Sequence, residues 1–259
     1  MLFRVAGMML LCATAFANSV AAQSPPSPAA SNRTVVAASK LPTVTDVPLY
    51  FRAMSVTLPP GEASTVSAAN GILYQVSGST ETVASDQKMV LNPGEGLFIA
   101  AGKQVMLKAG GGVPSVFLHF LLASATDLDR PPEPTPAAVR ELYRTPTPIP
   151  NLKPGGYDLN LTRVTFPPQM PSNPPHHLSG AALYFIIWGN GATTVDGKTE
   201  DKAPGSLIYE PWQIDQDFQS QPERHPVSLS GLLFASRSSR AFSNSSQAVI
   251  ARVAKVSSR

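Results

Sequence analysis

Short apolar segments separated by turn residues run along most of the chain. The segments are rich in β-branched and aromatic residues and end at Gly, Asn, Asp or Pro, as in VDGK at 195–198. This pattern predicts strands joined by hairpin turns. The 26 prolines among 259 residues favour the same interpretation, because proline interrupts helix interiors. We therefore expect an all-β protein.

The same landmarks occur twice along the chain. They are VTLPP at 56–60 and VTFPP at 164–168, the strand-like segments 72–78 and 183–189, each ending in glycine, and the Pro-Gly pairs at 93–94 and 204–205. Repetition at matching spacing indicates two copies of one β-rich unit. We expect each copy to close into a barrel or sandwich, because closure removes exposed strand edges.

The N-terminal residues predict export. Residues 1–22 combine Arg4, the apolar run 8–16 and small residues that end at Ala22, which is the pattern of a cleaved signal peptide. The only cysteine, Cys12, lies in this segment, so the mature chain would hold no disulfide and no thiolate ligand. We expect an exported protein, periplasmic or secreted, without a membrane span in its mature chain.

The remaining chain divides by composition. We expect a disordered Pro/Ser-rich spacer at 23–45, a first barrel at 46–124, a Pro-rich linker at 125–155 with a short helix at 137–143, a second barrel at 156–236, and a basic segment at 237–259. The formal charge of +3 is too small and too scattered to indicate a nucleic-acid partner.

The repeated landmarks resemble the cupin superfamily, in which a first motif ends in glycine and a second motif begins with Pro-Gly. The resemblance implies two double-stranded β-helix barrels, which are jelly-roll-like, in one chain, that is, a bicupin. It also implies a metal site, because two histidines and a glutamate of the first motif and a histidine of the second bind a divalent ion such as iron, manganese or zinc in that family.

Counted back from the glycine at 189, the family's ligand positions fall on His176, Leu178, Ala182 and Gln216. Of these, His176 alone keeps the family's residue type. In the first copy the positions hold Thr65, Ser67, Gly71 and Val105, so none is kept. We therefore expect no cofactor, and if a divalent transition metal does bind, His176 would hold it.

The resulting hypothesis is a non-catalytic exported bicupin that binds a small molecule or carbohydrate in its second barrel. The residues expected to contact the ligand are His176, Tyr184, Trp212 and Gln216. One alternative is a metal-dependent cupin enzyme, an oxygenase or isomerase, with an atypical site around His176. The other alternative is a purely structural or assembly protein, and the resemblance also allows a homodimer.

Overall fold

Strands make up almost all of the regular structure, as expected. The computed structural model describes residues 31–44, 47–66, 69–84, 87–129, 134–166, 180–195, 198–211, 216–220 and 227–235. Within these ranges it contains seventeen strands and one short 3-10 helix, η1 (Ala125–Asp127). No helix in this part of the chain is long and apolar enough to cross a membrane.

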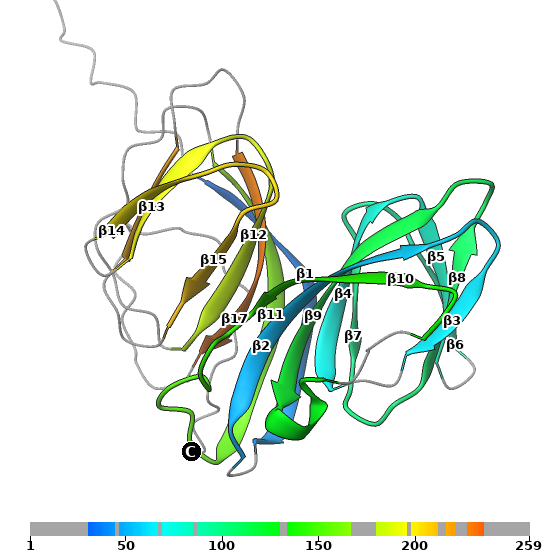
Figure 1. Ribbon diagram of the computed structural model, residues 1–259, viewed down its shortest axis with the longest axis horizontal. Helices are drawn as coiled ribbons and strands as arrows, with labels where there is room; N and C mark the ends of the chain where they lie inside the picture. Colours follow the sequence, from blue (N-terminus) through cyan, green and yellow to red (C-terminus); the bar gives the residue numbers. More distant parts are fainter. Residues whose placement is uncertain are drawn as a thin grey trace, which may run out of the picture.

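Each half of the molecule is a barrel made of two sheets (Figure 1). The five-stranded sheet of the first barrel has the strand order β10 (Ala138–Arg144), β2 (Leu49–Leu58), β9 (Ser115–Ser124), β4 (Asn70–Ser77), β7 (Gly96–Ile99). Its four-stranded sheet has the order β3 (Ala63–Val66), β8 (Val105–Gly110), β5 (Ser79–Ala84), β6 (Gln87–Leu91). The five-stranded sheet of the second barrel has the strand order β1 (Asn32–Val44), β11 (Gly155–Phe166), β17 (Val227–Ala235), β12 (Ala182–Trp188), β15 (Leu207–Glu210). Its other sheet has the order β14 (Lys198–Lys202), β13 (Gly191–Val195), β16 (Gln216–Ser220).

The two barrels repeat each other down to single hydrogen bonds. In the first barrel Gly94 donates its backbone N–H to the carbonyl of Gln75 at 2.9 Å, and in the second Gly205 donates to Ile186 at 2.8 Å. Both glycines have positive φ, +90° and +88°, a conformation that residues with a side chain rarely adopt. The repeated Pro-Gly landmark is therefore the same tight turn in both copies.

Two strands are exchanged between the halves. Strand β1 precedes the first barrel in sequence but pairs with β11 of the second, and β10 precedes the second barrel but pairs with β2 of the first. The expected disordered spacer is thus wrong for residues 32–44, and the expected helix at 137–143 is wrong. In both segments a neighbouring sheet edge supplies backbone partners, and this pairing outweighs local composition.

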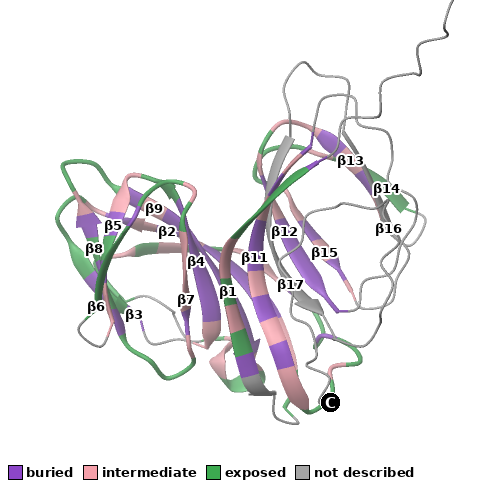
Figure 2. Cartoon of the chain, turned by 180° about the vertical axis from the view of Figure 1, so that it is seen from behind, coloured by how far each residue is buried: buried purple, intermediate pink, exposed green. Residues whose placement is uncertain are grey.

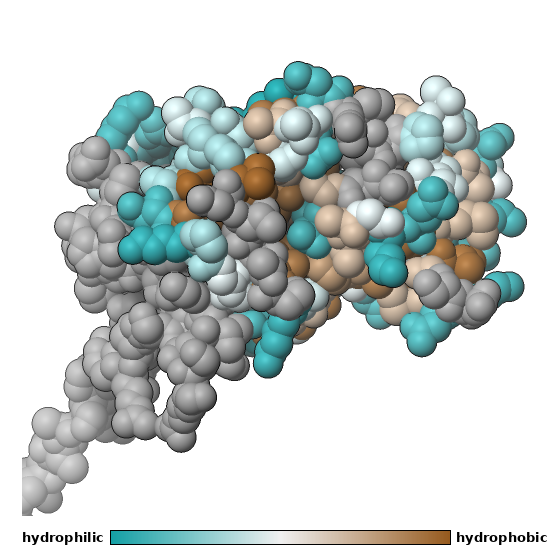
Figure 3. Space-filling model, turned by 90° about the horizontal axis from the view of Figure 1, so that it is seen from below, coloured by the Kyte–Doolittle hydropathy of each residue, from teal (hydrophilic) through white to brown (hydrophobic). Residues whose placement is uncertain are grey.

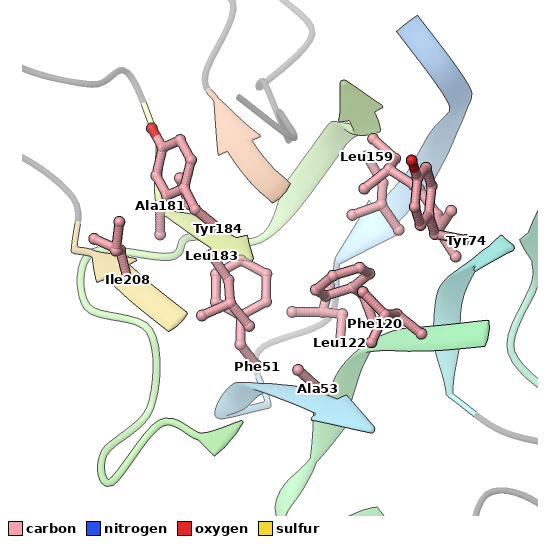
Figure 4. Close-up of a cluster of buried hydrophobic side chains, with 14 of the residues drawn as sticks. Phe51, Ala53, Tyr74, Phe120, Leu122, Leu159, Ala181, Leu183, Tyr184 and Ile208 are labelled. Atoms are coloured by element: carbon pink, nitrogen blue, oxygen red, sulfur yellow. The ribbon is translucent and has the colours of Figure 1, made fainter. Parts of the chain in front are cut away.

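The two five-stranded sheets face each other across an apolar layer. Phe51, Ile72, Phe120, Leu159 and Leu183 are fully buried in one cluster that spans both halves. Figure 2 shows the buried residues concentrated on the strands where the halves meet, and Figure 4 shows part of the layer in detail. Burying an aromatic or aliphatic side chain of this size stabilises the fold by about 1.5–3 kcal/mol, so this layer is a main source of stability.

A glycine on β7 allows the exchanged strand to approach closely. A Cβ atom added at Gly96 would lie 2.8 Å from Cγ1 of Val36 on β1 and 2.7 Å from the carbonyl oxygen of Leu73. Both distances are too short for real contacts. Strand β1 therefore covers the edge of the first barrel's sheet while it completes the sheet of the second.

The edge strands β6 and β14 occupy equivalent positions in the two barrels but differ in the polarity of their exposed side chains. On β6, Met89 and Val90 are exposed, whereas Glu200 on β14 forms ion pairs of 2.6 Å with Lys198 and with Lys202. Charged side chains protect a strand edge against pairing with another chain. Figure 3 shows hydrophilic and apolar residues mixed over the described surface of the first barrel. A homodimer stays a prediction, with β6 as the less protected edge.

Arg52 fastens the exchanged strand β10 to β2. Its side chain is buried, and its Nη2 and Nε lie 2.7 and 2.9 Å from Oε2 of Glu141 on β10. Nη1 of Arg52 also donates to the carbonyl of Asp127 at 3.2 Å. Burial alone would raise the pKa of Glu141, but the hydrogen bonds from Arg144 and Arg52 lower it below its usual value. The carboxylate therefore stays ionised and holds the strand in place.

We predict that Glu141→Gln destabilises the protein by about 2 kcal/mol, because the change leaves the guanidinium of Arg52 buried without its charged partner. This figure is reduced for the partial exposure of Glu141. Urea unfolding monitored by circular dichroism measures the effect. Glu200→Gln, which removes a carboxylate from an exposed strand edge, is the matched control and should change the midpoint little. Equal effects of the two changes would contradict a clamping role for Arg52.

Candidate functional site

The inner face of the second barrel carries a polar patch on β12 and β15. Ala182 is paired with Glu210, and Tyr184 is paired with Ile208. Because paired residues lie on the same face of a sheet, these four form one patch inside the barrel. The alternate residue Leu183 faces the first barrel, and Figure 4 shows Tyr184 pointing away from Leu183 and Phe51.

Glu210 and Tyr184 are joined inside this patch. The hydroxyl of Tyr184 donates a hydrogen bond to Oε2 of Glu210. Only 5% of Glu210 and 2% of Tyr184 is exposed to solvent. Burial raises the pKa of Glu210 to about 8, although the hydrogen bond from Tyr184 acts in the opposite direction. At neutral pH the carboxyl is therefore mainly protonated.

The first barrel has apolar residues at the equivalent positions. Leu73 replaces Tyr184 and Ile99 replaces Glu210, and both are fully buried. The residue opposite this position on the neighbouring strand also differs between the barrels. Leu73 is paired with His119 on β9, whereas Tyr184 is paired with Gly231 on β17. The barrel closes with either set, so the fold does not require the polar pair.

His119 lies inside the first barrel. It is fully buried on β9, on the same side as Phe117 and Leu121, which belong to the core of that barrel. The polar groups of this interior gather nearby. Gln75 Nε2 donates to Ser115 Oγ at 2.9 Å, and Thr80 donates to Gln75 Oε1 at 2.7 Å. These residues satisfy one another, which is typical of a structural network.

The described residues do not form the metal site that the cupin resemblance implies. In the first barrel, a Cβ added at Gly71 would lie 2.7 Å from the carbonyl oxygen of Phe120, so no glutamate fits there without a backbone shift. In the second barrel, Ala182 has no donor atom. Among the residues that the structure describes, no three His, Cys, Asp or Glu side chains are grouped closely enough to hold an ion.

The expected ligand-contacting residues have different outcomes. Tyr184 lies inside the second barrel, and its contact with a ligand stays a prediction. Gln216 begins β16, where its backbone pairs with Val195. His176 and Trp212 fall outside the described residues, so their roles stay predictions. Glu210 was not among the expected site residues. The repeat could have revealed it, because it occupies the place of Ile99 in an otherwise apolar strand.

Comparisons with known proteins support the fold. No protein-family model and no curated protein matches the chain. Among solved structures, AerE from Microcystis aeruginosa is 15% identical with a TM-score of 0.51, over 69% of this chain and 85% of its own. A cupin 2 conserved barrel domain protein from Leptotrichia buccalis is 18% identical with a TM-score of 0.44, over 77% and 90%. Salicylate 1,2-dioxygenase from Pseudaminobacter salicylatoxidans is 11% identical with a TM-score of 0.47, over 70% of each chain.

At these identities the likeness concerns the fold alone. It agrees with what the chain shows by itself, namely antiparallel strands in two barrels whose turns and pairings repeat. The expectation of two repeated β-barrels in one chain is thereby confirmed.

Proposed function

We propose that this protein is an exported, non-catalytic binding protein that holds a small molecule in its second barrel, at Tyr184 and Glu210. The observation that carries the proposal is the buried polar pair in an otherwise apolar patch. Small-molecule sites are mostly apolar cavities with a few well-placed polar groups. Ala182, Ile186 and Ile208 supply the apolar part of such a surface.

A binding role explains the pair better than a structural role does. A carboxyl group that is moved from water into an apolar interior costs free energy unless its partners compensate. The first barrel avoids this cost with Leu73 and Ile99, which are equally buried. A sequence that keeps a costly group where the fold accepts aliphatic residues indicates that the group serves binding.

The proposal predicts that ligand binding depends on the pair. Tyr184→Leu combined with Glu210→Ile gives the second barrel the residues of the first, so it should keep the fold and lose the ligand. A screen of small polar metabolites and monosaccharides by thermal shift would find ligands that raise the Tm of the unaltered protein. Those shifts should vanish in the double variant and persist in Ile99→Val, the matched control in the first barrel.

Two results would contradict this proposal. One is a set of thermal shifts that the double variant retains in full, which would place binding elsewhere. The other is a near-equimolar content of iron, manganese or zinc in protein purified without a tag, lost in His176→Ala. That result would support the metal-dependent oxygenase or isomerase instead.

The pair also predicts a distinct pH dependence of stability. Between the ordinary value of 4.5 and about 8, the folded chain keeps the proton of Glu210 while the unfolded chain has lost it. The unfolded state then binds fewer protons, so stability falls as pH rises, by up to about 1.4 kcal/mol per unit. Above about pH 8 both states are ionised, and this contribution changes no further.

Urea unfolding between pH 5 and 8 measures this slope. Glu210→Gln should remove part of the loss of stability with rising pH, because an amide does not titrate. Glu81→Gln, on the exposed side of β5, should leave that loss unchanged. Identical slopes in the unaltered protein and in Glu210→Gln would show that Glu210 ionises normally in the folded chain.

A further inference from the structure

We propose that a second copy of this chain pairs with strand β6, so that the four-stranded sheets of the two first barrels join into one sheet across a two-fold axis. The proposal does not depend on the ligand site in the second barrel. It rests on three features of the outer side of the first barrel: the open edge of β6, the apolar side chains at that edge, and the charges beside it.

The edge of β6 is accessible to another strand. Among the described strands β6 pairs with β5 alone, and it ends the strand order β3-β8-β5-β6. This sheet lies on the side of the first barrel away from the second (Figures 1 and 2), and four of the five residues of β6 are exposed. In an antiparallel pair only alternate residues bond to the partner strand, so the other residues of β6 direct their N–H and C=O groups to the open edge.

Apolar side chains lie at the same edge. Met89 and Val90 on β6 are 41% and 50% exposed, and Met106 on β8 is 43% exposed. By register Val90 lies on the outer face of the sheet, because it pairs with exposed Glu81. Met89 pairs with buried Thr82 and so belongs to the other face. Pairing with another chain would remove apolar side chains on both faces from water.

The charges on the outer face select the partner. By strand alternation and register, the outer-facing residues nearest the edge form two rows, which are Lys108, Glu81 and Val90 in one and Met106, Val83 and Lys88 in the other. Strand β3 continues these rows without a charge, through Ala63 and Thr65. The ion pairs in the described part of the chain involve neither Glu81 nor Lys88. Both can therefore pair with opposite charges on a second copy.

A two-fold axis at Met89 brings these charges together. A two-fold axis perpendicular to the sheet keeps the outer faces on one side, so antiparallel copies of β6 can be centred on Lys88, Met89 or Val90. Centring on Lys88 would place two lysines opposite each other, which is unfavourable. Centring on Val90 would place Lys88 opposite Asn92 of the second copy. Centring on Met89 places Lys88 opposite Val90 of the second copy, in the row that contains Glu81 of that copy.

This arrangement combines an ion pair with apolar cover. Lys88 and Glu81 of the second copy lie two strands apart, about 10 Å between their backbones, and their long side chains can meet above Val90. The aliphatic stem of the lysine then covers that valine. The two-fold axis repeats the contact, and Met89 meets its own copy on the other face. Because one pair of short strands buries less than a standard interface, we expect a dissociation constant of about 1–100 µM.

Two charge reversals test the partner and the register together. Glu81→Lys gives a chain with lysine at both positions and Lys88→Glu a chain with glutamate at both, so each variant should repel its own copy. In a one-to-one mixture every lysine faces a glutamate of the other chain. By sedimentation velocity of the full chain under reducing conditions, we expect a dimer of the unaltered protein, a dissociation constant raised about tenfold or more in each variant, and recovered association in the mixture.

Val90→Lys places lysines opposite each other and should also raise the dissociation constant about tenfold or more. Thr199→Lys, on the exposed edge strand β14, is the matched control and should leave the dimer unchanged. The altered side chains are exposed, so circular dichroism and Tm should stay as in the unaltered protein. The inference would be overturned by a chain that stays monomeric at about 0.5 mM, by a dimer that Thr199→Lys weakens and Val90→Lys does not, or by a mixture that associates no better than its components.

Discussion

The apolar layer between the two five-stranded sheets is the interaction on which the rest of the molecule depends. Phe51 and Phe120 of the first barrel meet Leu159 and Leu183 of the second in one continuous cluster. Neither sheet could leave this face in water, because each would expose a row of large aliphatic and aromatic side chains. Strands β1 and β10 also join the two halves. Strand β1 leads along the sequence into the first barrel but is an edge strand of the second, and β10 leads into the second barrel but is an edge strand of the first.

This layer also holds the candidate site in place, because one face of β12 and β15 packs against the first barrel and the other face lines the interior of the second. Leu183 and Tyr209 pack toward the first barrel, and the ring of Tyr209 meets that of Phe51 edge to face, with centroids 6.1 Å apart. The alternate residues, Tyr184 and Glu210, then face the interior of the second barrel. Packing on one face of these strands thus fixes the position of the polar pair on the other, which is how a rigid scaffold orients a binding group.

Sequence reasoning found what repeats and missed what depends on pairing partners. The doubled landmarks predicted two barrels because tight turns need particular residues, as Gly94 and Gly205 show. Strands β1 and β10 could not be predicted from composition, because their partners are distant in sequence. The partner of β1 is β11, more than a hundred residues away, and that of β10 is β2, more than eighty residues away. Glu210 was overlooked because a carboxyl group at a position of the barrel core is recognised only when the two copies are compared position by position. His176 and Trp212 stay predictions.

The second barrel holds a neutral carboxyl group where the first holds an aliphatic side chain. The most direct measurement is the titration of the Glu210 carboxyl carbon by NMR, in protein labelled with carbon-13 at glutamate and assigned by comparison with Glu210→Gln. We expect a midpoint near 8, and a higher one in Tyr184→Phe, since the hydrogen bond from Tyr184 lowers the pKa of Glu210. A midpoint near the ordinary value of 4.5 would contradict it.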